Sequence, residues 1–250
     1  MISTNESDKL LLFMHIPKTG GQTLRGFIKK QYNFNETYRC PFMEEKIVEL
    51  SKDFRNSLKF IYGHFLFGTH EHFPKKFTYI SFMRDPVDRF ISAYYHILRH
   101  PTNRLHERVK SLSLEEFIDS DDFNLQTEPN IQTRFFCGKD PMSLEIAKKN
   151  ISEHFSVVGI TELFGESLFF MKKLFGWNNI DYEKRNVGTN RPKKMKISKE
   201  LIAKIKLKNQ IDMELYQFAR KKLEEQINAL DPQTKREMEI FKKDIVSNDG

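Results

Sequence analysis

The amino-acid sequence predicts an α/β fold with three layers, in which a parallel sheet lies between helices on both faces. Three observations support this class. Short apolar segments alternate along the chain with segments whose apolar residues recur at helical spacing. The segment 10–14 is apolar throughout, which is typical of a strand buried on both faces. Strands and helices that alternate in this order give parallel strands, because each helix returns the chain to the same edge of the sheet.

The first elements follow from apolar spacing. Residues 10–14 form the first strand, and a helix follows whose apolar residues share one face: Leu24, Phe27, Ile28 and Tyr32. Residues 32–41 are expected to form a loop and residues 42–54 a second helix. A short β-rich segment, 58–62, then predicts the second strand, which ends in Gly63 and His64.

The third strand, over residues 77–83, leads into the most regular helix of the chain. Asp85 suits the cap of this helix and Pro86 its first turn. Its apolar residues keep helical spacing: Val87, Phe90, Ile91, Tyr94, Tyr95 and Leu98. Residues 100–112 are polar and without period, so we expect an exposed loop there.

The second half of the chain continues the alternation. Ser113 and Glu116 have the spacing of a capping box at the start of a helix. One more strand is expected over 155–161 and a loop over 182–195. Further helices are expected from 129 to before Gly138, from Ser143, over 163–175 with Gly176 as the stop, over 198–209 and over 212–229. We expect one domain over residues 1–230 and a charged helical tail over 231–250.

Composition limits the possible partners. The chain of 250 residues has a formal net charge of +7, much of it carried by residues 184–208. A basic chain suits nucleic acid, a membrane surface, an acidic polysaccharide or a phosphorylated cofactor, although a solvated basic face explains the charge equally well. No run of about eighteen apolar residues occurs, and residues 1–9 do not resemble a signal peptide. Cys40 and Cys137 lack metal-ligand spacing, so we expect reduced thiols and a cytoplasmic protein.

The turn between the first strand and its helix, residues 15–24, is the first chemically informative motif. A strand-to-helix turn directs free backbone N–H groups and the helix dipole to one spot, which favours a phosphate-like anion. Gly20 and Gly21 let a ligand approach the backbone, and Lys18 adds a positive charge. Further donors come from Thr19, Gln22 and Thr23. The alternative is a tight turn in which the glycines serve geometry alone.

The second motif, residues 84–94, follows the third strand. Arg84 ends the strand and Ser92 lies about two helical turns later, so the guanidinium and the hydroxyl could bind one phosphate. Alternatively, Arg84 pairs with a helix cap and Ser92 only packs. Both motifs lie at the carboxyl ends of strands, where parallel α/β sheets bind their ligands.

These motifs resemble those of the sulfotransferases that use 3′-phosphoadenosine 5′-phosphosulfate (PAPS), which have a P-loop-like nucleotide-binding fold. Residues 17–23 resemble the 5′-phosphosulfate loop of that family, and residues 84–92 its 3′-phosphate motif. The resemblance is strongest to the branch of the heparan sulfate and chondroitin 2-O-sulfotransferases and similar bacterial proteins. Four more segments resemble that branch in the same order: 63–65, 132–138, 158–162 and 215–219. The resemblance therefore spans about residues 10–223.

The resemblance implies an enzyme that moves a sulfuryl group from PAPS to an acceptor hydroxyl without a metal. The expected acceptor is a glycan, and a small alcohol or a lipid is the alternative. Lys18 matches the cation beside the departing phosphate oxygen, and His64 matches the general base. Without the motif, His64 would be an ordinary histidine at a strand end. A late basic loop, 185–193, resembles the segment that closes over the 3′-phosphate, with Thr189, Arg191 and Lys193 as its binding residues.

One position departs from the resembling branch. Where the eukaryotic 2-O-sulfotransferases have a further histidine two residues before the base, this chain has Tyr62, which puts their substrate preference in doubt. His70 and His72 could contact an acceptor, although exposed loop histidines are the simpler interpretation.

Two other functions remain open. A P-loop nucleotide kinase shares the strand, loop and helix, but its GxxxxGK[ST] sequence is absent, and no strand ends in an evident magnesium ligand. A basic module that binds a polyanion without catalysis would explain the charge, but it would not explain His64 or the two anion-binding turns. We expect neither a nucleic-acid partner nor an integral membrane segment, and the sequence does not determine the oligomeric state.

Overall fold

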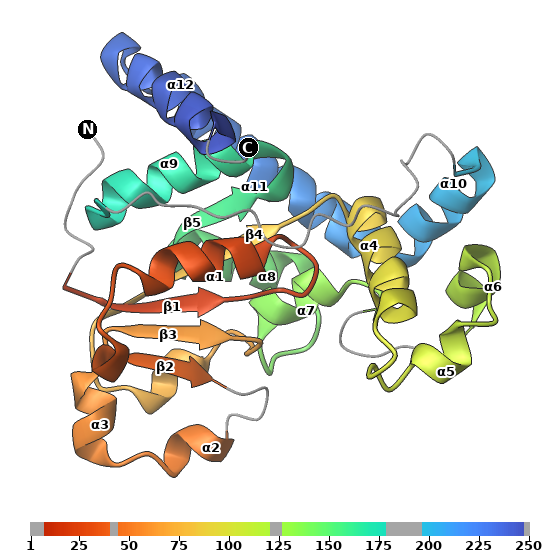
Figure 1. Ribbon diagram of the computed structural model, residues 1–250, viewed down its shortest axis with the longest axis horizontal. Coiled ribbons are helices and arrows are strands. Elements are labelled where there is room, and N and C mark those ends of the chain that lie inside the picture. Colours follow the sequence, from red (N-terminus) through yellow and green to blue (C-terminus); the bar gives the residue numbers. More distant parts are fainter. Residues whose placement is uncertain (1–7, 41–44, 121–126, 179–196, 248–250) are drawn as a thin grey trace.

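A single sheet of parallel strands organises the protein. The computed structural model describes residues 8–40, 45–120, 127–178 and 197–247. The sheet has five strands in the order β2-β3-β1-β4-β5, and every pair is parallel (Figure 1). The strands are β1 (Leu10–Met14), β2 (Thr37–Cys40), β3 (Phe60–Gly63), β4 (Phe77–Met83) and β5 (Phe155–Ile160). The predicted class, a parallel sheet between helices, is confirmed.

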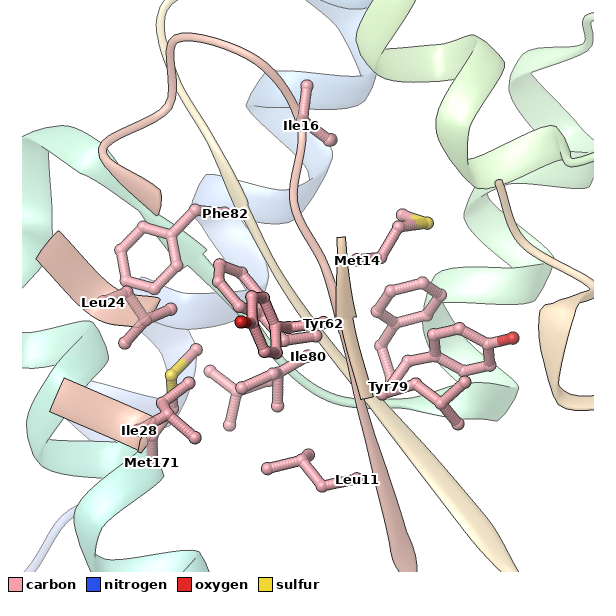
Figure 2. Packing of buried hydrophobic residues seen from close by; sticks show 14 of the residues in the cluster. Leu11, Met14, Ile16, Leu24, Ile28, Tyr62, Tyr79, Ile80, Phe82 and Met171 are labelled. Atoms are coloured by element: carbon pink, nitrogen blue, oxygen red, sulfur yellow. The ribbon is translucent and has the colours of Figure 1, made fainter. Parts of the chain in front are cut away.

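Two helices cover one face of the sheet. These are α1 (Gly21–Lys29) and α9 (Phe164–Phe175), which lie in front of the strands in Figure 1. Figure 2 shows Leu24 and Ile28 of α1 and Met171 of α9 gathered around Ile80 and Phe82 of β4. Since alternate residues of a strand face the same side, Ile80 and Phe82 mark this face along the whole strand.

The opposite face is covered by α7 (Ile131–Cys137) and α8 (Leu144–His154). Phe136 of α7 contacts Phe155 of β5, with 5.0 Å between ring centroids, and Phe155 contacts Tyr79 at the same distance. Tyr79 precedes Ile80 in β4 and therefore points to the other side of the sheet. The long helix α11 (Gln210–Asn228) packs against α7, α8 and β5.

A second hydrophobic cluster lies beside the carboxyl ends of the strands (Figure 1). It is built on α4 (Pro86–Arg99), which follows β4 directly. The other helices of the cluster are α5 (His106–Val109), α6 (Leu114–Asp119) and α10 (Lys199–Lys208). Because α4 starts directly after β4, its first turn lies at the carboxyl end of the sheet.

Several predicted helix ends are confirmed. The Asp85 carboxylate accepts a hydrogen bond from the backbone N–H of Asp88 at 3.0 Å, with Pro86 in the first turn. Ser113 and Glu116 form the predicted capping box. Gly176 ends α9 in the left-handed conformation, with φ 65°.

The region between α1 and β3 differs from prediction. Residues 32–41 contain a short 3₁₀ helix (Phe34–Glu36) and the strand β2, where a loop was expected. The expected helix over 42–54 is wrong: the described residues form α2 (Glu45–Val48) and α3 (Lys52–Ser57). The Ser51 hydroxyl, which accepts a hydrogen bond from the N–H of Phe54 at 3.2 Å, starts α3 as a new helix.

Residues 100–112 are also more ordered than predicted. They contain α5, and Leu105 and Val109 are buried in the second cluster. These two residues are four apart, which is one helical turn, so a single apolar pair is enough to anchor the helix. Two short 3₁₀ segments complete the described elements, Thr69–His72 and Thr161–Leu163.

The predicted C-terminal tail forms α12 (Pro232–Ser247), which packs on α9. Met238 and Phe241 are buried there, and Lys242 pairs with Glu166 at 2.6 Å. The helix therefore shares a core with the sheet, while the boundary at residue 230 stays a prediction. Cys40 and Cys137 are buried and unbridged. Of the helices described, none combines the length and apolar character that crossing a membrane requires.

Candidate active site

The turn from β1 to α1 is held in a tight, unusual backbone conformation. Lys18 and Gly20 both have positive φ, 70° and 83°, and they flank the fully buried Thr19. The Thr19 hydroxyl donates to the carbonyl oxygen of Ile16 at 2.9 Å, which closes the turn on itself. Positive φ is costly for a residue with a Cβ, so Lys18 is strained where the neighbouring glycine is not.

The two glycines of the turn serve different purposes. Gly20 supplies the left-handed backbone. Gly21 begins α1 and lies against the His15 ring: a Cβ placed there would be 2.0 Å from Cδ2 of His15. Gly21 therefore leaves room for the ring under the start of the helix. The Thr23 N–H donates to the carbonyl oxygen of Gly20 at 3.2 Å, which closes the first turn of α1. The start of a helix carries a partial positive charge that favours an anion.

His64 is held by the residue that begins the turn. Its Nδ1 lies 2.6 Å from the carbonyl oxygen of His15, and the two imidazole rings stack with centroids 4.4 Å apart. A carbonyl oxygen only accepts, so Nδ1 carries the hydrogen, and in the neutral ring the lone pair is on Nε2. Among the described residues, no hydrogen-bond partner of Nε2 occurs.

Burial favours the neutral form of both rings. It lowers the pKa of His64, the hydrogen bond to His15 partly opposes this, and the charges of Arg39 and Arg25 lower the pKa further. Burial lowers the pKa of His15 well below its usual range, and the charges of His64, Arg25 and Lys18 act in the same direction. His64 is therefore poised to accept a proton at Nε2.

Arg84 joins the second motif to the first. Its Nη1 donates to the carbonyl oxygen of Lys18 at 3.2 Å, so the end of β4 and the β1–α1 turn share a hydrogen bond. The side-chain amide of Gln132, at the start of α7, forms hydrogen bonds with both backbone groups of Arg84. Its Nε2 donates to the Arg84 carbonyl and its Oε1 accepts from the Arg84 N–H, both at 3.0 Å. Three hydrogen bonds thus hold Arg84, one through its side chain and two through its backbone.

Two residues at the end of β5 also form hydrogen bonds with the β1–α1 turn and the end of β4. The Thr161 hydroxyl lies 2.9 Å from the carbonyl oxygen of Thr19 and 3.0 Å from that of Met83. The Glu162 carboxylate accepts from the N–H of Asp85 at 3.2 Å and from the Tyr216 hydroxyl at 3.0 Å. The segments around Gln132, Glu162 and Tyr216 therefore converge on the same strand ends.

A buried carboxylate, Asp212, supports the start of α7 behind these residues. The Asp212 carboxylate of α11 accepts from the N–H groups of Gln132 and Thr133 at 3.1 and 2.7 Å, and from the Thr133 hydroxyl at 2.7 Å. Its charge also acts on Arg89 of α4, which is fully buried. Burial lowers the pKa of Arg89 to about 10, and Asp212 opposes the shift.

The helix α4 presents Ser92 and His96 one turn apart. Ser92 is largely buried, and His96 is half-buried with its ring 3.9 Å from that of His100. Burial lowers the pKa of His96 to about 4, and the next contribution is the charge of Lys18. The charge of Lys18 therefore acts on the side of α4 that carries His96.

Most residues predicted to form the site come together. Lys18, Thr19, Gly20, Gly21 and Thr23 form one turn, Arg84 touches it, and His64 stacks on the histidine that begins it. The Gln22 side chain and the predicted binding residues Thr189, Arg191 and Lys193 lie outside the described residues.

Sequence reasoning missed the supporting residues. Four of them lie in segments that carried the resemblance without an assigned role, namely Gln132, Thr161, Glu162 and Tyr216. Asp212 lies outside those segments, and only its place in the first turn of a helix marked it. Among the described residues, no group of three or more His, Cys, Asp or Glu could hold a metal ion, and the prediction of metal-free chemistry stays a prediction.

Comparison with known proteins identifies the family. A family model described as the sulfotransferase family matches residues 2–219. The chain belongs to the sulfotransferase family. The match covers every residue of the site described above, and the family prediction from the two motifs is confirmed.

The sulfotransferase is similar to enzymes of animal glycan sulfation. Human heparan-sulfate 6-O-sulfotransferase 2 is 24% identical over 274 residues, which cover 86% of this chain and 44% of that protein. Human uronyl 2-sulfotransferase is 29% identical over 142 residues, 44% of this chain and 33% of that protein. Heparan sulfate 2-O-sulfotransferase 1 of Xenopus laevis is 26% identical and is covered to 52%. The chain thus spans less than half the length of the two human relatives.

Proposed function

We propose that this sulfotransferase transfers a sulfuryl group from PAPS to a hydroxyl of a carbohydrate. The proposal rests on the family, on the names of the relatives, which act on heparan sulfate and uronyl groups, and on the site. The observation that carries it is the hydrogen bond from Arg84 to the Lys18 carbonyl, with His64 held beside the same turn. A donor with phosphates at both ends needs two linked anion sites, and the acceptor hydroxyl needs a base near the 5′ site.

The residues suit an in-line transfer. The acceptor hydroxyl forms a bond to sulfur while the bond from sulfur to the 5′-phosphate oxygen breaks. Nε2 of His64 takes the proton of the hydroxyl, because Nδ1 is committed to the His15 carbonyl. The Lys18 ammonium and the first N–H groups of α1 stabilise the charge that develops on the departing phosphate oxygen. Arg84 and Ser92 hold the 3′-phosphate, and the loop 185–193 stays a predicted part of that site.

The donor assignment is tested by calorimetry with 3′-phosphoadenosine 5′-phosphate (PAP), the product of PAPS, and separately with ATP and magnesium. We expect PAP to bind tightly and ATP weakly, since only PAP has a 3′-phosphate for Arg84. An Arg84→Ala variant should weaken PAP binding, whereas His64→Ala should not. Tight ATP binding without PAP binding would instead support the nucleotide kinase that the strand, loop and helix also allow.

The reaction is tested with radiolabelled sulfate donor and a mixture of glycan acceptors. We expect label on carbohydrate with the native protein and a loss of about 10² to 10⁴ in rate with His64→Ala. A protein that binds polyanions in a salt-dependent manner, yet transfers no label to any acceptor, would be the non-catalytic module.

A further inference from the structure

The two kinds of backbone polar group in the β1–α1 turn have different partners. Carbonyl oxygens of the turn accept hydrogen bonds from inside the protein, namely those of Met14, His15, Ile16, Lys18, Thr19 and Gly20. By contrast, the N–H groups of Thr19, Gly20 and Gly21 donate no hydrogen bond to any residue that the structure describes. Gly20 is exposed, so a ligand can reach its backbone. The turn therefore keeps N–H donors for a ligand, which suits an anion.

The peptide group between Thr19 and Gly20 is not fixed by its own sterics. Glycine adopts φ of either sign, so this peptide can rotate by half a turn and leave Gly20 in an allowed conformation. In a trans peptide the C=O and N–H bonds point in opposite directions. The partner of the Thr19 carbonyl therefore decides where the Gly20 N–H points. That partner is Thr161, whose hydroxyl donates to the Thr19 carbonyl oxygen at 2.9 Å.

The Thr161 side chain also contacts the strand that carries the second motif. Thr161 follows β5 directly, and its hydroxyl lies 3.0 Å from the carbonyl oxygen of Met83, the last residue of β4. Since a hydroxyl has one hydrogen, the two carbonyl oxygens share it. The methyl group lies on the side of Gly20, where a Cβ would be 3.8 Å from Cγ2 of Thr161. Thr161 thus holds the turn against the end of β4.

We propose that Thr161 is a positioning residue for the sulfuryl donor: its hydroxyl orients the Thr19–Gly20 peptide so that the Gly20 N–H donates to the 5′-phosphate group. The assignment rests on the proposed function, because it takes the β1–α1 turn as the site of that group. Without the hydroxyl, the peptide rotates more freely and the N–H loses its alignment. The 3′-phosphate site does not depend on Thr161, because the Gln132 amide holds the Arg84 backbone separately.

Three nucleotides separate the two phosphate sites in a calorimetric test: PAP, adenosine 5′-monophosphate and adenosine 3′-monophosphate. Thr161→Val keeps the shape of the side chain and removes its hydroxyl. We expect this variant to weaken the binding of PAP and of the 5′-monophosphate about tenfold, because one N–H to a charged phosphate is lost. Its affinity for the 3′-monophosphate should not change. Thr161→Ser keeps the hydroxyl and should bind all three nucleotides as the native protein does.

Thr78→Val is the matched control. The buried Thr78 hydroxyl also joins β4 to β5, where it pairs with the Ser156 hydroxyl, but it lies at the opposite end of these strands. This control should leave every affinity unchanged. The proposal is overturned if Thr78→Val weakens the 5′-monophosphate as much as Thr161→Val does. It is also overturned if Thr161→Val weakens both monophosphates equally, since the hydroxyl would then only stabilise the sheet.

A measurement on the native protein needs no variant. The backbone amide resonance of Gly20 in isotope-labelled protein should shift downfield on titration with the 5′-monophosphate, because the N–H gains a charged acceptor. It should not shift in this way with the 3′-monophosphate. A Gly20 amide that does not respond, or a Thr161→Val variant that binds the 5′-monophosphate as the native protein does, overturns the positioning role alone. A native protein that binds neither PAP nor the 5′-monophosphate overturns the proposed function as well.

Discussion

At the scale of single residues, the β1–α1 turn shows why two adjacent glycines are not interchangeable. The pair was predicted to let an anion approach the backbone. The structure assigns the left-handed backbone to Gly20 and the packing of the His15 ring to Gly21. Only the first role has a sequence signal, since a glycine pair after a strand is typical of a turn. The second depends on a ring that reaches the glycine from the end of the strand, so only the folded chain shows it.

This difference gives a prediction for Gly21→Ala. The new methyl group would lie about 2 Å from the His15 ring and displace it. Because His15 stacks on His64, we expect a loss of stability of about 1–3 kcal/mol together with slower transfer. The double variant His15→Ala with Gly21→Ala should recover part of the stability, because it removes the clash. Thermal unfolding of the four proteins in this cycle measures the coupling, and strict additivity would contradict the clash.

The protonation of His64 gives a second prediction at this scale. In the proposed mechanism the neutral ring is the base. Burial lowers the pKa of His64, so neutral His64 persists below the usual value of 6.5. We expect kcat to hold on acidification to below pH 6.5 and then to fall. Removing the nearby charge with Arg25→Gln should raise the pKa of His64 and move this fall to higher pH. An acid limb that lies above pH 6.5, or that does not move in Arg25→Gln, would show that another group is titrating.

At the scale of elements, four strands of the sheet were predicted from the sequence, and the edge strand β2 was not. The strand 77–83 has the predicted bounds, because an apolar β-rich run ends at an Asp-Pro pair that starts a helix. The edge strand β2 was missed because its Tyr38 and Arg39 are partly exposed and give no apolar run. The supporting residues around Arg84 escaped prediction for another reason: each is polar, and its role requires contacts between elements far apart in sequence.

The two hydrogen bonds between the Gln132 amide and the Arg84 backbone give a prediction at the scale of elements. They connect the start of α7 to the end of β4. We expect Gln132→Ala to weaken PAP binding about tenfold, because it frees the Arg84 backbone. The pH at which kcat falls on acidification should not change, because His64 stays in place. Gln132→Glu is the stricter comparison, since it keeps the acceptor oxygen and loses the donor. If Gln132→Ala binds PAP as well as the native protein does, the two Gln132 hydrogen bonds are not needed to place Arg84 for PAP binding.

At the scale of the whole molecule, two hydrophobic clusters meet where two buried side chains of opposite charge, Arg89 and Asp212, interact electrostatically. One cluster contains the sheet and α11, and the other contains α4, α6 and α10. Asp212 belongs to α11 and Arg89 to α4, so their interaction crosses the boundary between the clusters. Burial raises the pKa of Asp212, while Arg89 and the hydrogen bonds from α7 oppose the shift. The pair therefore links the helix that holds Ser92 to the body that holds the β1–α1 turn.

Removing one partner of this pair should be far more costly than removing both. Asp212→Ala removes the carboxylate whose charge favours the buried Arg89 guanidinium, and it also removes the acceptor for two N–H groups of α7. We expect a loss of about 3–5 kcal/mol in the free energy of unfolding. Arg89→Met combined with Asp212→Asn removes both charges at similar volume and should cost much less than Asp212→Ala. Urea unfolding measures all three proteins, and equal losses in the single and double variants would show that the helix cap, rather than the charge pair, holds the clusters together.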